Sequence, residues 1–139
     1  MSFAIPTIWE EVLEELDKTG EKLESLDRIL SGGTAVPEWM IRQFKNDYNV
    51  HVIHAWGMTE TSPLGTANTP LRSHANLPKK QKIEKMYNAG RPNWSVQIKI
   101  VDREGIELPR DGESEGDLLV RGPTAVSYTH LTLPTIYSV

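Results

Sequence analysis

The five residues from Trp56 to Glu60 place an aromatic ring, a bare backbone, a hydroxyl and a carboxylate close together in the sequence. Trp56 could stack on a purine base, and Gly57 would let a ligand approach the backbone closely. Thr59 could donate its hydroxyl to a phosphate oxygen, and Glu60 could coordinate magnesium, which prefers hard oxygen ligands. Packing offers another interpretation, in which Trp56 belongs to the core and Thr59 caps a turn. Taken alone, the segment leaves both interpretations open.

A glycine-rich segment, Ser31–Ala35, lies about twenty residues upstream. Gly32 and Gly33 would let a flat ring or a phosphate lie against the backbone, with free amide groups nearby. A tight turn between a strand and a helix would also account for the glycine pair. This segment and Trp56–Glu60 each follow a short apolar run. We therefore expect both on loops at strand ends, where open α/β sheets bind their ligands.

The elements that must position these loops begin with a helix. Apolar residues recur at helical spacing over residues 6–18, with glutamates on the opposite side, and Gly20 is a plausible stop. Residues 21–30 predict a short turn of helix that leads into the apolar run Ile29-Leu30.

A second helix and a strand complete the unit. Pro37 suits the first residue of a helix, and Asn49 suits a left-handed stop. A nearly continuous apolar run over residues 50–56 predicts a strand in a mostly buried sheet. Strand, glycine-rich turn, helix and strand are typical of a βαβ unit with parallel strands. His51 and His54 are three residues apart on this strand, so they point to opposite faces and cannot share a metal ion without distortion.

The pattern changes after Pro63. Residues 64–80 read as a loop, and a short helical stretch then runs to Tyr87. The lysines along this stretch are Lys79, Lys80, Lys82 and Lys85. We interpret this charge run as a solvated face, with a phosphate site as the alternative.

Alternating apolar residues predict short antiparallel strands in the last third of the chain. The first spans residues 95–100 and the second 118–120, with turn signals at 102–105 and 109–112. The fold class is therefore α/β, with part of a parallel-sheet βαβ layer followed by short antiparallel β-strands.

The composition limits the classes of function. The 139 residues are 38% hydrophobic and 24% charged, as in a globular domain. A net charge of −4 gives no overall electrostatic attraction for nucleic acid. The lack of cysteine excludes disulfides, thiol catalysis and cysteine-bound zinc. No apolar run approaches the roughly 20 residues of a membrane span, and the start lacks a signal-peptide pattern. We expect a cytoplasmic protein, free or peripheral to the membrane.

The two loops, in this order, resemble those of the adenylate-forming, AMP-binding enzymes: acyl-CoA synthetases, luciferases and the adenylation domains of peptide synthetases. Within that superfamily, residues 31–37 and 54–66 look most like the medium- and long-chain fatty acyl-CoA synthetases. Gly90-Arg91-Pro92 and residues 116–123 match the family further on. The resemblance covers residues 1 to about 127.

The resemblance implies roles for the loop residues. Gly33, Thr34 and Ala35 would pack against one face of adenine, with Trp56 on the other. The full cofactor-binding set implied is Gly32, Gly33, Thr34, Ala35, Ala55, Trp56, Gly57, Met58 and Thr59.

The reaction implied is attack of a carboxylate on ATP to give acyl-AMP and pyrophosphate, followed by transfer to the coenzyme A thiol. Thr59 and Glu60 would be the catalytic residues. Thr59 would contact the α-phosphate, and Glu60 would hold Mg²⁺. Gly57 and Met58 would line the boundary between the nucleotide and the acyl chain. The partner would be a small carboxylic acid, most simply a fatty acid.

Departures from the family pattern suggest a partial domain. The family's phosphate loop would lie upstream of Met1, and the ribose aspartate and the catalytic lysine would follow Ser127. We therefore expect an internal fragment of the large N-terminal domain, inactive in isolation. Its parts would be 1–88, a partial α/β subdomain with the adenine and phosphate loops, and 89–127, a partial β-rich subdomain. Residues 128–139 would be a tail outside the family sequence, and the segment from about Val126 to Val139 resembles translated sequencing-adapter read-through.

Two alternatives stay open from the sequence. The chain could be a free-standing nucleotide-binding or interaction module without chemistry. It could also belong to a ligase for an aryl or amino acid, because much of the acyl pocket would lie outside these residues.

Overall fold

A computed structural model describes residues 1–126, so the tail expected at 128–139 lies outside the described residues. The chain divides into two compact units. The first consists of Met1–Trp56 with Thr66–Arg91. The second consists of Gly57–Gly65 with the described chain from Pro92 onward.

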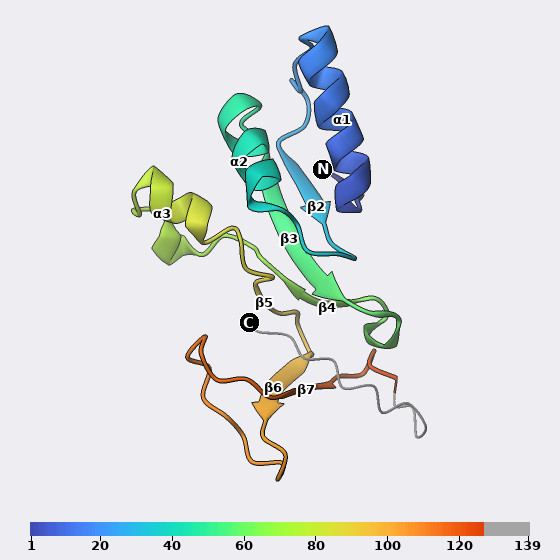
Figure 1. Cartoon of the computed structure of the whole chain (residues 1–139), viewed down its shortest axis with the longest axis vertical. Coiled ribbons are helices and arrows are strands. Elements are labelled where there is room, and N and C mark those ends of the chain that lie inside the picture. The colour runs from blue at the N-terminus through green and yellow to red at the C-terminus, as the bar shows by residue number, and fades with distance from the viewer. Residues whose placement is uncertain (127–139) are drawn as a thin grey trace. The chain divides into compact units, whose positions relative to one another are not determined.

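Parallel strands form the centre of the first unit (Figure 1). The order along the larger sheet is β1-β2-β3-β4-β5, with bounds Ser2–Ala4, Arg28–Ser31, His51–Gly57, Leu64–Ala67 and Arg91–Pro92. The strand β2 pairs in parallel with β1 and with β3. The helix α2 (Glu38–Asp47) connects β2 to β3, so the predicted βαβ unit is confirmed.

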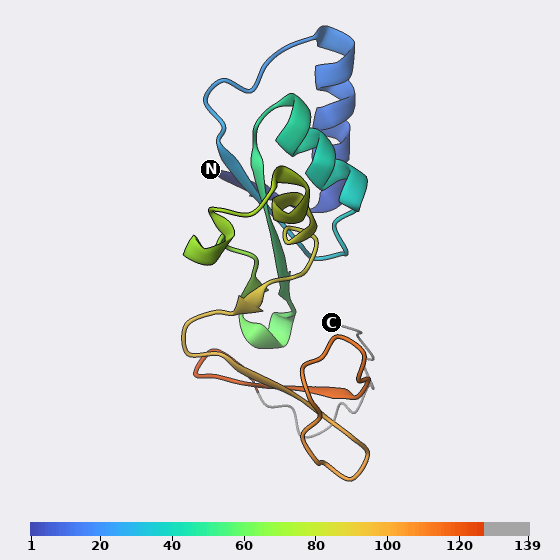
Figure 2. The same cartoon turned by 90° about the vertical axis from the view of Figure 1, so that its left-hand side faces the viewer.

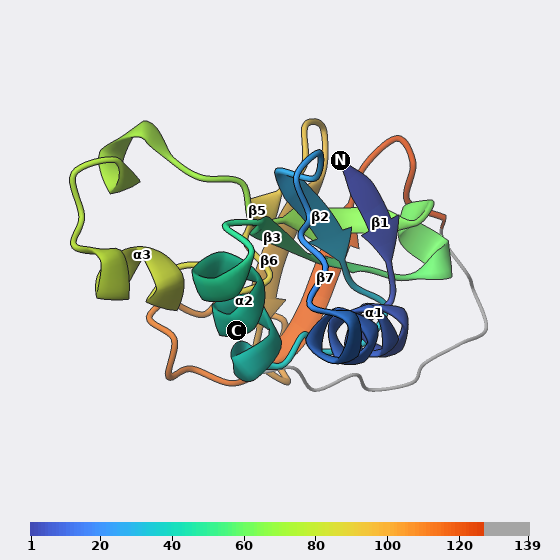
Figure 3. The same ribbon diagram turned by 90° about the horizontal axis from the view of Figure 1, so that it is seen from above.

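Two helices cover the same face of these strands, as Figures 2 and 3 show. In α1 (Pro6–Thr19) the buried residues Trp9, Leu13 and Leu16 recur at helical spacing, which makes one apolar stripe. The Trp9 indole N–H donates to the carbonyl of Leu30, which fixes α1 on β2 (3.4 Å). Gly20 ends α1 in the left-handed region (φ 70°), as predicted.

The core of the first unit lies between the helices and the sheet. Trp9 and Phe44 meet edge to face, with ring centroids 5.8 Å apart and an interplanar angle of 88°. The fully buried Ile29, Val50 and Val52 supply the sheet side of the same cluster. Burial of these side chains supplies the hydrophobic stabilisation that holds β2 and β3 in register.

The rest of the first unit follows β4. The helix α3 (Lys79–Glu84) confirms the short helical stretch predicted there, and a short 3₁₀ helix spans Arg72–His74. The side-chain amide of Asn68 donates to the carbonyls of Lys85 (2.6 Å) and Asn88 (2.8 Å), which ties the end of β4 to the chain after α3.

The second unit contains a two-stranded antiparallel sheet, as predicted. Its strands are β6 (Gln97–Val101) and β7 (Asp117–Arg121). The Asp102 carboxylate accepts the backbone N–H groups of Glu104 (3.0 Å) and Ile106 (2.8 Å), which forms the turn expected after the first strand.

Several expectations from the sequence need correction. Residues 21–30 contain no helix; they pass through a turn at Glu24-Ser25 into β2. Residues 64–80 are not all loop, because β4 and the 3₁₀ helix lie within them. Pro37 precedes α2 instead of starting it, since its ψ of 140° is extended. The three-residue strand β1 was not anticipated, because so short a segment carries no periodicity. In the described part of the chain, no helix is long and apolar enough to cross a bilayer.

Candidate functional site

The carboxyl ends of two neighbouring parallel strands carry the candidate adenine residues. Ser31, the last residue of β2, pairs in register with His54 of β3. The glycine-rich segment therefore leaves β2 beside Ala55 and Trp56. The glycine-rich segment lies on a loop, as expected. Trp56 and Gly57 instead end β3 itself, and the loop begins at Met58.

Close packing explains the first glycine of the pair. A Cβ added to Gly32 would collide with the backbone carbonyl of Ala55. Gly33 has a φ of 90°, which favours glycine. The turn is thus held against β3, and the next two residues, Thr34 and Ala35, are exposed.

Trp56 is only partly buried and is absent from the core cluster. The interpretation that assigned it to the core is therefore wrong for this structure. An indole that keeps an accessible part is available for stacking on a flat ring.

The two histidines of β3 have separate surroundings. The Nδ1–H of His54 donates to the carbonyl of Tyr87 (2.8 Å), since a carbonyl oxygen only accepts. Burial lowers the pKa of His54, and this hydrogen bond partly opposes that shift. Burial also lowers the pKa of His51, with further contributions from the charges of Lys45 and Arg28. Both imidazoles are therefore uncharged at neutral pH.

A buried hydroxyl organises the loop that carries Thr59 and Glu60. Thr61 is only 3% exposed, and its Oγ1 accepts the N–H of Met58 (3.0 Å). The same oxygen lies 2.9 Å from the Met58 carbonyl and 2.7 Å from that of Pro63, so its one proton has two possible acceptors. Sequence analysis missed this residue, because a threonine in a polar run carries no signal of burial.

Backbone contacts complete the same loop. The Thr61 N–H donates to the Met58 carbonyl (2.9 Å), forming one turn of 3₁₀ helix over Thr59–Thr61. A Cβ on Gly57 would collide with the carbonyl of Pro63, so this glycine permits the loop to fold back on β3. The turn leaves Thr59 exposed and Glu60 partly exposed.

The chemistry of Glu60 fits a hard cation. Its backbone carbonyl accepts the N–H of Val126 (2.8 Å). No ion pair in residues 1–126 engages its carboxylate. In the same range, no three acidic or histidine side chains gather where they could hold a metal. A magnesium ion on Glu60 would therefore take most of its oxygen ligands from a nucleotide and water, as is common for this ion.

A third glycine motif, Gly90-Arg91-Pro92, is also explained by close packing. Gly90 has a φ of 82°, and a Cβ there would collide with the backbone of Ala67. The Thr66 hydroxyl donates to the carbonyl of Ala89 (2.6 Å) beside it.

Comparison with protein families gives a match to the AMP-binding enzymes over residues 1–128. The chain is 49% identical over 122 residues to a 3-methylmercaptopropionyl-CoA ligase of Ruegeria lacuscaerulensis, covering 88% of this chain and 23% of that protein. It is 48% identical to a medium-chain-fatty-acid–CoA ligase of Ectopseudomonas oleovorans, covering 88% and 22%. The chain thus spans less than a quarter of the length of these curated relatives.

Solved structures of CoA ligases resemble this chain in fold. A long-chain-fatty-acid-CoA ligase from Archaeoglobus fulgidus superposes with a TM-score of 0.71 at 22% identity, covering 89% of this chain and 25% of that one, which shows the fold. An o-succinylbenzoate CoA synthetase from Bacillus subtilis, in complex with ATP and magnesium, gives a TM-score of 0.67 at 28% identity, covering 91% and 23%.

Proposed function

The chain belongs to the family of AMP-binding enzymes, and from this premise we propose that it carries the adenine, α-phosphate and magnesium residues of an ATP-dependent acyl-CoA ligase. The ligase would join a carboxylate to ATP, giving acyl-AMP and pyrophosphate, and then transfer the acyl group to the thiol of coenzyme A. The names of the curated relatives support a fatty or similar small carboxylic acid as substrate. The cytoplasm, or the surface of a membrane facing it, would supply all three substrates.

The parallel register of β2 and β3 is the observation that carries this proposal. It places Gly32 against Ala55, so the glycine-rich turn and the end of β3 share one edge of the sheet. Ligands of open α/β sheets bind at this edge. Adenine would lie with one face against Gly33–Ala35 and the other against the accessible part of Trp56.

The loop after β3 would serve the reacting phosphate. Thr59 is exposed and can donate its hydroxyl to an α-phosphate oxygen, while Glu60 can hold magnesium. When bound, the metal ion would stabilise negative charge on the phosphate oxygens. The buried hydroxyl of Thr61 would keep Thr59 in place, which matters because catalysis of this kind depends on donors that are positioned beforehand.

The boundary between nucleotide and acyl chain would fall at Gly57 and Met58. Met58 is 42% exposed, although its backbone N–H is engaged by Thr61. A flexible thioether at this point suits an acyl chain of variable shape.

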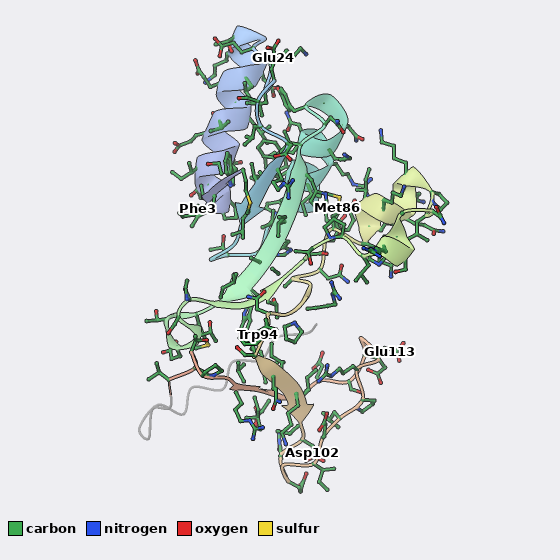
Figure 4. The ribbon with its side chains drawn as sticks, turned by 180° about the vertical axis from the view of Figure 1, so that it is seen from behind. Phe3, Glu24, Met86, Trp94, Asp102 and Glu113 are labelled. Atoms are coloured by element: carbon green, nitrogen blue, oxygen red, sulfur yellow. The ribbon has the colours of Figure 1, made fainter. Side chains whose placement is uncertain are left out.

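The isolated chain would be inactive. Large apolar side chains are open to solvent in both units, among them Phe3 (80% exposed) and Trp94 (94%), both labelled in Figure 4. Exposed apolar side chains of this size are typical of surfaces that further protein covers. We expect the chain by itself to bind acyl-adenylates weakly.

A chimera tests the proposed function. Residues 1–126 would replace the matching stretch of the medium-chain ligase from Ectopseudomonas oleovorans. We expect the purified chimera to catalyse octanoate-dependent exchange of pyrophosphate into ATP. A folded chimera without exchange activity would contradict the proposal.

The alternative function is that of a free-standing nucleotide-binding module. The exposure of Thr34 and Thr59 is the one observation that favours it. Isothermal titration of the 139-residue chain with a non-hydrolysable acyl-adenylate analogue separates the two functions. Micromolar or tighter binding by the isolated chain would favour the module, and weak binding would favour the ligase segment.

A further inference from the structure

A cavity of about 280 Å³ lies in the first unit between α3, the end of α2 and the start of β3. Three lysines line it, Lys45 from α2 and Lys82 and Lys85 from α3 and the residue after it. The imidazoles of His51 and His74 add two further nitrogen-bearing groups, and no aspartate or glutamate contributes to the described wall. We call this cavity the lysine pocket.

The lysine pocket is separate from the candidate nucleotide residues. His51 is the first residue of β3, whereas Trp56 lies near the other end of the same strand. The pocket therefore opens at the amino end of β3, away from the edge where the glycine-rich turn emerges.

Hydrogen bonds hold the walls of the lysine pocket in place. Asn68 donates its backbone N–H to the carbonyl of His54 (2.8 Å) and its side-chain amide to the carbonyl of Lys85 (2.6 Å). The segment that carries the two lysines is thus tied to β3. Met86, labelled in Figure 4 beside α3, is 6% exposed and joins the core cluster below the pocket.

The charges of the lysine pocket are not neutralised by an ion pair among the described residues, and the Lys45 ammonium donates to the neutral side-chain oxygen of Asn49 (2.8 Å). No ion pair in residues 1–126 involves Lys45, Lys82 or Lys85, whereas Lys80 on the same helix pairs with Glu84 (4.0 Å). Three like charges around one concavity raise the local concentration of multivalent anions.

The ring of His51 contributes to the wall of the lysine pocket. The Nε2 of His51 is buried and has no hydrogen-bond partner among the described residues. Because this nitrogen is not accessible to solvent, it lies behind the pocket wall and offers no hydrogen bond to a ligand in the pocket. Burial and the charges of Lys45 and Arg28 lower the pKa of His51, so the ring is neutral and the positive charge of the pocket comes from its lysines.

Apart from Asn68, the remaining wall of the lysine pocket is apolar and includes Pro70, Leu71 and Ala75. We propose that the pocket binds a phosphate monoester with a small apolar group. The dianionic phosphate would lie among the three lysines, beside the neutral ring of His51, and the apolar group would lie against Leu71 and Met86. Three cations match a dianion better than they match a single carboxylate. The assignment is independent of the proposed ligase function.

Titration of the ¹⁵N-labelled 139-residue chain with butyl phosphate tests this site. We expect saturable amide shifts at His51, Lys82 and Lys85, with none in β6 and β7. Butyrate carries a similar apolar group on a monoanion and should bind at least about five-fold more weakly, because it forms fewer ion pairs. The same titration with inorganic phosphate tests whether free phosphate, instead of a phosphate monoester, is the natural ligand of the pocket.

A matched pair of variants distinguishes binding in the lysine pocket from nonspecific attraction to the positive charge of α3. Lys82→Gln should weaken binding of butyl phosphate about five-fold, the upper range for one exposed ion pair. Lys79→Gln makes the same charge change on the same helix, outside the pocket wall, and should leave binding within two-fold, about the lower end of that range. Both side chains are exposed, so neither change threatens the fold.

Three results would overturn the proposal: no saturable shift at His51 and Lys85, equal affinity for butyrate and butyl phosphate, or equal weakening by the two variants. Inorganic phosphate that binds as tightly as butyl phosphate would overturn the apolar part of the assignment.

Discussion

The hydroxyl of Thr61 makes all its described hydrogen bonds within its own loop. It joins Met58 and Pro63 on either side of the residues proposed to contact the phosphate and the metal. Gly57 adds to this arrangement through steric fit, because any side chain there would meet the Pro63 carbonyl. The candidate catalytic residues are therefore held by neighbours that need not touch a substrate.

Replacing Thr61 by valine tests this role at the residue scale. Valine keeps the shape but leaves the Met58 N–H without its acceptor, at a cost of about 1–2 kcal/mol to the loop. We expect the Met58 amide to exchange with solvent roughly ten-fold faster, measured by hydrogen–deuterium exchange. Thr61→Ser keeps the hydroxyl and should stay near the wild-type rate. Equal exchange in both variants would exclude the hydroxyl as the support of the loop.

At the scale of elements, the sequence predicted the parts that depend on local pattern. The stripe of Trp9, Leu13 and Leu16 predicts α1, and the apolar run before Trp56 predicts β3. The short strands β1 and β4 were missed because each holds only three or four residues. No periodicity in so short a segment distinguishes a strand from a loop.

The candidate site, too, was predictable from the sequence only where it depends on local pattern. The residue types in the two loops suggest a nucleotide, but only the register of Ser31 with His54 places both at one edge. The burial of Thr61 and the lysine pocket depend on tertiary packing. The lysines of α3 were interpreted as a solvated face, and the sequence gives no sign that Lys45 and His51 come near them.

The end of α1 offers a prediction at this scale. Gly20 has a φ of 70°, and no atom lies within 4 Å of a Cβ placed there. Gly20→Ala should therefore cost about 1 kcal/mol through backbone strain alone. Gly20→Asn should cost less, since asparagine tolerates the left-handed region. Urea unfolding followed by circular dichroism measures both, and equal stability of the alanine variant would contradict the cap geometry.

For the whole molecule, two uncharged histidines link stability to pH. The pKa values of His51 and His54 are lowered in the fold from an ordinary value of 6.5. Below that pH the unfolded chain binds more protons than the folded one, so the unfolding free energy should fall as the pH drops from 7 towards 5. The pKa of the Asp111 carboxyl is lowered from 3.8 to about 2. Its contribution to the unfolding free energy is therefore lost only as the pH falls below 3.8, outside this range.

Urea unfolding at several pH values between 5 and 7.5 measures this slope. The double variant His51→Asn/His54→Asn should flatten the slope, whatever its effect on stability at pH 7.5. An unchanged slope would mean that other groups carry the dependence.

The chain as a whole is proposed to supply one wall of an acyl-adenylate site, and Glu60 is the residue on which that claim depends most. The most direct test is acyl-AMP formation by the chimera with the Ectopseudomonas oleovorans ligase, with Glu60→Gln compared to Glu104→Gln in an exposed turn of the second unit. We predict that Glu60→Gln lowers the rate at least about 100-fold, as expected when a group that stabilises the transition state is lost, while Glu104→Gln has little effect. Circular dichroism should show both variants folded. An unchanged rate in a folded Glu60→Gln chimera would contradict the account.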